Sequence, residues 1–232
     1  KAAVNTAQRH SKGTQYVFKT DIANYYESMQ HHTLQSLCCE QVSDKRVQRL
    51  LWQVMNRVHV RAGAHRLIAN KSIPRGCPLS PLFSAVYLQA VDRYARQHKI
   101  RYVRYMDDFV FFSESRHKLR RIIKDVYSII SELGLSLSQP KTWIGKVGHG
   151  FDFLGYRISP SGLRIAQASL DRFINTCGRL YEQGADIPRL AAYVKRWIQW
   201  ARSGVVLNLK QLVLTTTKIL QNFFTSIDTK SI

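Results

Sequence analysis

The sequence predicts an α+β fold in which an antiparallel sheet carries helices on one face. Short runs rich in β-branched and aromatic residues lie next to Asp21 and to the pair Asp107 and Asp108, as expected for strands. Apolar residues recur at helical spacing over 43–58 and 115–133. Alternating strand and helix patterns of this kind favour one sheet with helices packed on it. At 232 residues, the chain is long enough for one large domain or two lobes.

The first strand is expected over 16–22, and it carries Asp21 at or near its end. Tyr25 and Tyr26 follow within one turn. A lone Asp at the end of a strand is usually a cap or a turn residue, so this position needs support from elsewhere in the chain. Residues 1–15 are polar and basic, with a turn-like break at 10–13.

The next predicted helix starts with Ser43 as its N-cap and has an apolar stripe that ends near Val58. Its basic outer face is either solvated or placed along phosphates, and both interpretations stay open. Residues 59–72 are expected to form a hairpin or loop. The segment 73–81, IPRGCPLSP, then predicts a rigid turn, with Ser80 capping a helix that starts at Pro81 and continues through Tyr94. Gly76 in this turn lets the backbone approach a ligand, although a proline-stiffened helix start explains the same residues.

The segment Tyr105-Met106-Asp107-Asp108 lies between two apolar runs, 100–103 and 109–112, which we interpret as a hairpin with the acids at its tight turn. Two like charges about 4 Å apart repel by about 4 kcal/mol at an effective dielectric near 20, so this cluster needs a cation or a proton. Magnesium is the natural candidate. The alternative is a merely polar turn, because Asp is common in turns.

Later elements are a helix over 115–133 ended by Gly134, a short strand over 135–137 leading to Lys141, and a second hairpin around the turn 159–162. From Ser169 onward only helical patterns occur, over 170–181, 188–202 and 207–224. Trp197 and Trp200 in this basic, aromatic region serve equally well as core residues or as nucleic-acid contacts.

The charge of the chain favours a polyanionic partner. Its 35 Lys and Arg residues against 15 Asp and Glu give a formal charge of +20, which points to nucleic acid ahead of an anionic membrane. The cysteines Cys38, Cys39, Cys77 and Cys177 show no zinc-binding spacing and are expected to be reduced thiols of an intracellular protein. We see no signal peptide or membrane-spanning run. Because the first residue is Lys1 rather than Met, we expect a fragment or a processed chain with residues missing upstream.

Adjacent strands of the predicted sheet would bring Asp21 beside Asp107. Two ions held by such carboxylates can activate an attacking oxygen and stabilise a leaving one, which is the two-metal chemistry of phosphoryl transfer. Together with the positive charge, this chemistry points to nucleotide polymerisation.

Five motifs in order make the sequence resemble the reverse transcriptases. Residues 19–26, KTDIANYY, are similar to their first palm motif, 75–81, RGCPLSP, to the second, and 105–108, YMDD, to the signature third. Residues 135–142 with Lys141 resemble the fourth motif, and 153–156, FLGY, the primer grip. The resemblance covers residues 16–166 and is strongest to prokaryotic enzymes of the group II intron and retron lineages.

The resemblance implies a right-hand polymerase. Its parts would be a remnant of the fingers at 1–15, a palm at 16–166 with an inserted helix and loop at 43–72, and a helical thumb at 167–232. Asp21 and Asp107, with Ile22, would hold two Mg²⁺ ions, for which Mn²⁺ can substitute, and Asp108 would lie adjacent and contribute less. Lys141 matches the lysine that protonates the departing pyrophosphate.

The resemblance also implies substrate contacts. Ile22, Ala23, Asn24 and Tyr25 would lie near the triphosphate, while the ring of Tyr26 would exclude a ribose 2′-hydroxyl and so select dNTPs. Further substrate contacts and the primer grip would come from later motifs, namely Arg75, Gly76, Ser80, Pro81, Tyr105 and Met106, followed by Phe153, Leu154, Gly155 and Tyr156. Two departures matter: Arg75 stands where the family commonly has Gln, and too few residues precede the first palm motif to form the fingers.

The leading hypothesis is an RNA-directed DNA polymerase, a nucleotidyltransferase that extends a primer 3′-hydroxyl. Alternatives are template-independent or protein-primed DNA synthesis by the same site, and a maturase-like RNA-binding scaffold without catalysis. Expected partners are an RNA template, a DNA or RNA primer, dNTPs and a cognate noncoding or intron RNA, with no membrane. We expect a location in the bacterial cytoplasm, with a role in a mobile element or in phage defence.

Overall fold

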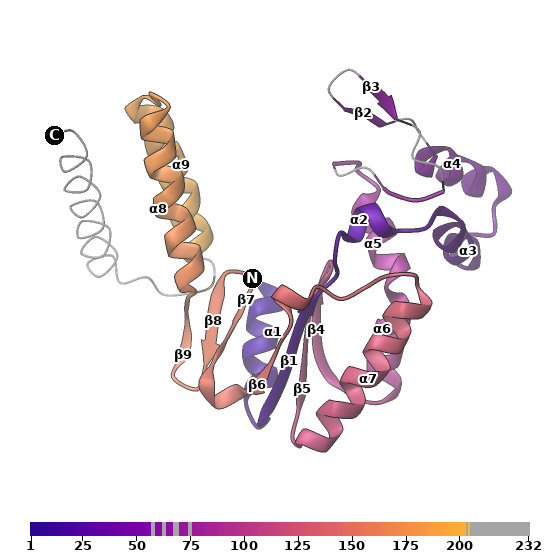
Figure 1. The fold of residues 1–232 in the computed structure, drawn as a ribbon, viewed down its shortest axis with the longest axis horizontal. Coiled ribbons are helices and arrows are strands. Elements are labelled where there is room, and N and C mark those ends of the chain that lie inside the picture. The colour runs from indigo at the N-terminus through magenta and orange to yellow at the C-terminus, as the bar shows by residue number, and fades with distance from the viewer. Residues whose placement is uncertain (57–58, 62–63, 67–69, 74–75, 203, 205–232) are drawn as a thin grey trace. The chain divides into compact units, whose positions relative to one another are not determined.

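The computed structural model describes residues 1–56, 59–61, 64–66, 70–73, 76–202 and 204. The chain divides into two compact units (Figure 1). One unit consists of residues 10–147, and the other of residues 1–9 together with the residues from 148 onward. Each unit is described by itself.

The larger unit is built on a four-stranded antiparallel sheet with the strand order β4-β5-β1-β6. Its strands are β1 (Tyr16–Asp21), β4 (Arg101–Tyr105), β5 (Asp108–Ser113) and β6 (Trp143–Lys146). In the β1–β5 pairing Asp21 lies opposite Asp108, and in the β4–β5 pairing Tyr105 lies opposite Asp108. The register therefore gathers the acidic residues at one end of the sheet.

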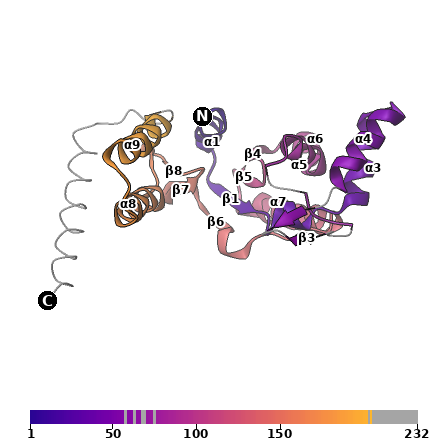
Figure 2. The ribbon, with the colours of Figure 1, turned by 90° about the horizontal axis from the view of Figure 1, so that it is seen from above.

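The core of this unit lies between the sheet and its helices. The helices are α2 (Tyr25–Ser28), α3 (His31–Gln41), α4 (Lys45–Met55), α5 (Ser80–Tyr87), α6 (Gln89–Gln97) and α7 (Arg116–Glu132). Phe18 of β1 stacks on Phe111 of β5 with ring centroids 5.8 Å apart, and Val126 of α7 is fully buried in the same core. Figure 1 shows α6 and α7 on one face of the sheet, and Figure 2 shows α3 and α4 side by side. The expected α+β fold, with helices on one face of an antiparallel sheet, is confirmed.

The smaller unit has a three-stranded antiparallel sheet formed by β7 (Phe151–Phe153), β8 (Tyr156–Ser159) and β9 (Gly162–Ile165). Two helices follow, α8 (Gln167–Glu182) and α9 (Ile187–Arg202). Trp197 stacks on Phe173 of α8 with ring centroids 4.2 Å apart, and Trp200 packs on Tyr156 with ring centroids 4.9 Å apart. Both tryptophans thus have packing roles inside this unit, as the core interpretation predicts.

Several boundaries differ from the sequence prediction. Residues 1–15, for which only a turn-like break at 10–13 was predicted, contain α1 (Ala2–Ser11). Helix α4 is capped by Asp44 and not by Ser43, because Asp44 Oδ1 accepts a hydrogen bond from the Arg46 amide at 2.8 Å. The helix expected from Pro81 through Tyr94 begins one residue earlier, at Ser80. It is divided into α5 and α6 at Leu88, whose backbone leaves the helical region.

The strand expected over 135–137 is a single bridge between Leu137 and Ile22, and a 3₁₀ turn, η1 (Gln139–Lys141), follows it. Strand β6 was not predicted. Trp143, Ile144 and Lys146 are all exposed, so no alternation of buried and exposed positions marks this strand in the sequence. Strands β2 (His59–Arg61) and β3 (Ala64–Arg66) confirm the hairpin expected in 59–72, and η2 (Val147–His149) precedes β7.

The predicted helix at 207–224 lies outside the described residues. The described helices include none that is long and apolar enough to cross a membrane.

Candidate active site

The tight turn between β4 and β5 carries the central acid. Because Tyr105 pairs with Asp108, only Met106 and Asp107 form the loop. Met106 has a positive φ of 56°, the pattern of a type II′ hairpin turn, in a region that disfavours an L-residue by about 1–2 kcal/mol. Arg104 Nη1 donates a hydrogen bond to the Met106 carbonyl oxygen at 3.2 Å. Since Arg104 also forms an ion pair with Asp92 of α6, the turn is fastened to a helix.

Three carboxylates meet at this end of the sheet. Asp21 is buried, with 3% of its surface exposed, and its cross-strand partner is Asp108. Burial and the neighbouring charge of Asp21 raise the pKa of Asp107 from its ordinary value of 3.8 to about 6. Burial, followed by the charge of Asp21, also raises the pKa of Asp108. The cluster therefore favours a bound cation or a proton.

One cation of the protein already contacts this cluster. Lys141, at the end of η1, forms an ion pair with Asp21, and the hydrogen bond between them raises the pKa of the Lys141 ammonium group. The lysine side chain remains 65% exposed. The segment around Lys141 is attached to β1 by a hydrogen bond from the Ser138 amide to the Asp21 carbonyl oxygen at 2.7 Å. This hydrogen bond between the two backbone segments therefore holds Lys141 close to Asp21.

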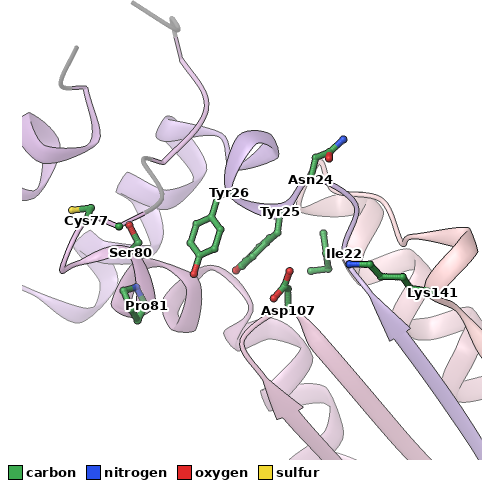
Figure 3. A pocket seen from close by; sticks show the side chains of 10 residues that line it. Ile22, Asn24, Tyr25, Tyr26, Cys77, Ser80, Pro81, Asp107 and Lys141 are labelled. Atoms are coloured by element: carbon green, nitrogen blue, oxygen red, sulfur yellow. The ribbon is translucent and has the colours of Figure 1, made fainter. Parts of the chain in front are cut away.

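A cavity of about 540 Å³ opens beside these residues (Figure 3). Four separate segments of the chain line it, contributing Ile22, Asn24, Tyr25, Tyr26, Gly76, Cys77, Ser80, Pro81, Asp107 and Lys141. Figure 3 shows the side chains of Asp107 and Lys141 on the same side of this space, with the Tyr26 ring across from them. The cavity therefore combines acidic, basic and aromatic groups.

The two tyrosines are held differently. Tyr25 is buried, its hydroxyl donates to the Ser84 carbonyl oxygen at 2.8 Å, and burial raises its pKa. Tyr26 is only half-buried, and its hydroxyl lies 4.0 Å from the sulfur of Met106. Tyr25 thus anchors the segment on α5, while the Tyr26 ring lies between this segment and the β4–β5 turn.

Most residues of the sequence-based site prediction line the cavity or adjoin it. Asp21, Ala23, Tyr105, Met106 and Asp108 do not line it, although they neighbour residues that do in sequence or across the sheet. Arg75 lies outside the described residues. Cys77 was not predicted as a site residue, although its place between Gly76 and Pro78 was a usable signal. Neither Asp92 nor Arg104 was predicted, because nothing in the sequence marks them as partners.

The segment 153–156 belongs to the smaller unit. Leu154 and Gly155 have φ values of 50° and 83° and form the loop between the paired residues Phe153 and Tyr156, as in a type I′ turn. The Tyr156 hydroxyl donates to the Trp200 carbonyl oxygen at 2.7 Å. The Tyr156 side chain thus connects this turn to α9, and the role of the turn as a primer grip stays a prediction.

The acidic residues fit magnesium as a ligand set completed by substrate. No group of three or more His, Cys, Asp or Glu side chains in the described part of the chain is arranged to hold a metal ion. Magnesium, however, is usually bound by one or two carboxylates together with waters and substrate phosphates. Asp21 and Asp107 supply such a pair, and the pKa of Asp107 is raised by burial and then by the charge of Asp21, both of which a divalent ion would offset.

An antiparallel sheet with helices on one face and acids in the β4–β5 hairpin turn is the arrangement of a polymerase palm. The chain matches the family described as Reverse transcriptase (RNA-dependent DNA polymerase) over residues 2–158, and it belongs to this family.

Among curated proteins, the chain is similar to Protein YkfC of Escherichia coli (strain K12), with 26% identity over 178 residues, which cover 62% of this chain and 46% of that protein. Among solved structures, it is similar in fold to telomerase from Candida albicans and from Candida tropicalis, each in complex with a TWJ fragment of telomeric RNA. The TM-scores are 0.57 and 0.58, both at 12% identity. The matches cover 95% and 93% of this chain but only 43% and 42% of the telomerase chains. The chain thus spans less than half the length of these relatives.

Proposed function

We propose that this chain carries the catalytic centre of an RNA-directed DNA polymerase that adds dNTPs to a primer 3′-hydroxyl by two-metal phosphoryl transfer. The observation that carries the proposal is the cavity, in which the acid of the β4–β5 turn, the lysine of η1 and the aromatic ring that follows β1 face one space. Membership of the reverse transcriptase family over residues 2–158 supports the same chemistry.

In this proposal Asp21, Asp107 and the Ile22 carbonyl oxygen hold two Mg²⁺ ions, or Mn²⁺ in their place, with Asp108 adjacent. When bound, such ions activate the attacking oxygen and stabilise the leaving one. The protein fixes the spacing of the carboxylates through the register in which Asp21 lies opposite Asp108. Asp107 must be ionised for this role, which its pKa of about 6 permits at neutral pH.

Lys141 is proposed to donate a proton to the departing pyrophosphate. Its contact with Asp21 keeps the ammonium group protonated, because that contact raises its pKa. Its exposure of 65% leaves the side chain room to turn toward a phosphate once the carboxylate has another cation. Proton donation by a positioned side chain contributes roughly 10²–10⁴-fold to rate.

The nucleotide is proposed to lie between the turn at Asn24 and the start of α5. Tyr26 would pack against the sugar and exclude a 2′-hydroxyl, while Ser80 and Pro81 would lie under the template base. Gly76 supports this arrangement because it lets the backbone approach a ligand. Its φ is 86°, and an added Cβ there would meet nothing within 4 Å. The glycine is therefore required by backbone conformation and not by crowding.

The remaining assignments follow from family membership and are proposals as well. The primer end would be held by 153–156, and the helices after 166 would act as a thumb. An RNA template, a primer and a cognate noncoding or intron RNA would be the partners, in a bacterial cytoplasm. Arg75 would contact the sugar or phosphate of the substrate.

Sequencing of the products tests the proposal against its alternatives. The full-length protein is given a DNA primer on an RNA template of defined sequence, with dNTPs and Mg²⁺. We expect products complementary to the template. Products unrelated to the template would favour template-independent synthesis, and tight RNA binding without any product would favour a scaffold role.

A further inference from the structure

Two clefts lie side by side at the end of the sheet opposite the acidic turn. One has a volume of about 450 Å³, the other of about 670 Å³, and both are lined by Lys99, Ile100 and Arg101, at the junction of α6 and β4. Arg101 pairs with Phe112 at one end of the β4–β5 ladder, and Tyr105 pairs with Asp108 at the other. At about 3.3 Å per residue, four residues of strand separate the clefts from the acidic turn by about 13 Å. This α6–β4 surface is therefore distinct from the catalytic cavity.

The α6–β4 surface carries an excess of unpaired positive charge. Besides Lys118, which pairs with Glu114, four exposed Lys and Arg side chains line the clefts: Arg96, Lys99, Arg101 and Arg121. None of these four lies within 4.0 Å of a carboxylate oxygen among the described residues, whose ion pairs involve other side chains. The two acids that line the clefts, Asp92 and Glu114, are paired with Arg104 and Lys118. The four cations are thus left for an external anion.

The backbone conformation of Lys99 is a second, independent observation that favours anion binding at this surface. Helix α6 ends in a Schellman motif, in which the Ile100 amide donates to the Ala95 carbonyl oxygen at 2.8 Å and the Lys99 amide to the Arg96 carbonyl oxygen at 3.1 Å. Lys99 therefore occupies the left-handed position, with a φ of 51°. Glycine is strongly preferred at this position because it has no Cβ.

Two other described helices end in the same motif, and both follow that preference. After α7 the corresponding residue is Gly134, with a φ of 70°, and after α8 it is Gly184, with a φ of 72°. Among these three helix ends, only that of α6 has a residue other than glycine at the left-handed position. That residue is Lys99, which carries an ammonium group and lines both clefts. A strained residue of this kind is better explained by binding than by folding.

We propose that the α6–β4 surface binds the sugar-phosphate backbone of a nucleic acid at a site separate from the catalytic cavity. The cations lie in two adjoining open clefts and not in one enclosed pocket, which suits a linear polyanion better than a small anion. Exposed Arg116, Arg120 and Lys124 extend the positive charge along α7 from the same end of the sheet. Because side chains such as these contact phosphate and not base edges, the binding would position RNA or DNA without selecting its sequence. This inference goes beyond the proposed polymerase activity and does not depend on it.

The test measures binding of the full-length protein to a fluorescent RNA hairpin, and to a DNA hairpin of the same sequence, from 50 to 300 mM NaCl. One phosphate contact contributes a slope of about −0.9 to log K against log salt, so its loss weakens binding by about fivefold at 150 mM. We expect Lys99→Gly to raise the Kd by about that factor and to lower the slope by about one. Adding Arg101→Gln should multiply the effect by a similar factor.

Two controls separate binding from folding and from general charge. Because glycine suits the left-handed position, Lys99→Gly should leave the Tm unchanged or raise it by a few degrees, at about 2–4 °C per kcal/mol for a chain of this size. The matched control is Arg93→Gln on α6, which removes one exposed positive charge that lines neither cleft and is paired with Glu40 at 3.5 Å. This control should change the Kd less than twofold.

An equal effect of Lys99→Gly and Arg93→Gln would overturn the proposal, because the chain would then bind through its overall charge alone. A loss of affinity for a polyglutamate probe with no loss for either hairpin would also overturn it, in favour of an acidic protein partner. A loss confined to the RNA hairpin would support the proposal and identify RNA as the ligand. Equal losses for RNA and DNA would support it for both nucleic acids.

Discussion

Replacing Arg104 by methionine tests how the fold holds the catalytic turn. The Arg104 guanidinium donates through Nε to Asp92 Oδ1 at 2.9 Å, pairs with the second Asp92 oxygen, and donates to the Met106 carbonyl oxygen at 3.2 Å. The side chains of Arg104 and Asp92 are only 14% and 24% exposed. Methionine keeps the apolar stem of the arginine but removes all three hydrogen bonds.

The expected loss of stability follows from this burial. Removing one partner of a buried ion pair destabilises a protein by about 3–5 kcal/mol. Asp92 keeps the hydroxyl of Tyr102 as a donor and is partly accessible to water, so we expect about 2 kcal/mol for Arg104→Met. For a chain of this size, that corresponds to a fall in Tm of about 4–8 °C.

Thermal unfolding and primer extension together provide the assay. Arg93→Met is the matched control, because Arg93 and Glu40 form an ion pair at 3.5 Å with side chains 51% and 54% exposed, and exposed pairs contribute about 0–1 kcal/mol. We expect Arg104→Met to lower kcat at least tenfold at temperatures where it is folded, because Met106 loses its hydrogen-bond donor. Equal changes in Tm and kcat for the two variants would refute the assigned role of Arg104.

Three further predictions concern single residues. Tyr26→Ala should raise ribonucleotide incorporation, measured by alkaline cleavage of the products, and unchanged sugar selectivity would remove Tyr26 from the gate. Because the folded protein raises the pKa of Asp107 from 3.8 to about 6, it binds that proton more tightly than the unfolded chain does. The carboxyl group therefore becomes destabilising as pH rises through 4–6. Thermal unfolding in EDTA should show Asp107→Asn gaining stability over wild type across that range, and a constant difference would contradict the assigned pKa. Gly155→Ala should destabilise the smaller unit by about 1–3 kcal/mol in urea unfolding, because the new Cβ would lie 2.7 Å from the Trp200 ring at a φ of 83°. Gly148→Ala, where a Cβ meets nothing within 4 Å, should be nearly neutral.

The acidic site was predictable from sequence because its parts are local. Strand patterns on both sides of Asp107 and before Asp21 place the carboxylates at strand ends, and antiparallel pairing then brings Asp21 opposite Asp108. The contact of Lys141 with Asp21 was harder to predict from the sequence. It depends on hydrogen bonds between 136–138 and 21–23, which no periodic pattern records.

Features that depend on tertiary contacts were missed for the same reason. Strand β6 has exposed apolar residues such as Ile144, so its pairing with β1 leaves no alternation in the sequence. The break at Leu88 between α5 and α6 follows no Gly or Pro, and the ion pair of Arg104 with Asp92 joins a strand to a helix. The unusual place of Lys99 is visible only once its φ is known.

The measurement that tests the central claim most directly is Mg²⁺-dependent extension of a DNA primer on an RNA template by the full-length protein, with Asp107→Asn beside Asp171→Asn. Asp171 is an exposed acid of α8 whose carboxylate accepts a hydrogen bond from Gln167 at 2.8 Å, so its variant controls for the loss of one negative charge. We predict template-copied product from wild type and Asp171→Asn, no product from Asp107→Asn, and nearly equal RNA binding by all three. Full activity of Asp107→Asn, or a parallel loss of its RNA binding, would contradict the assignment of the acidic turn as the catalytic centre.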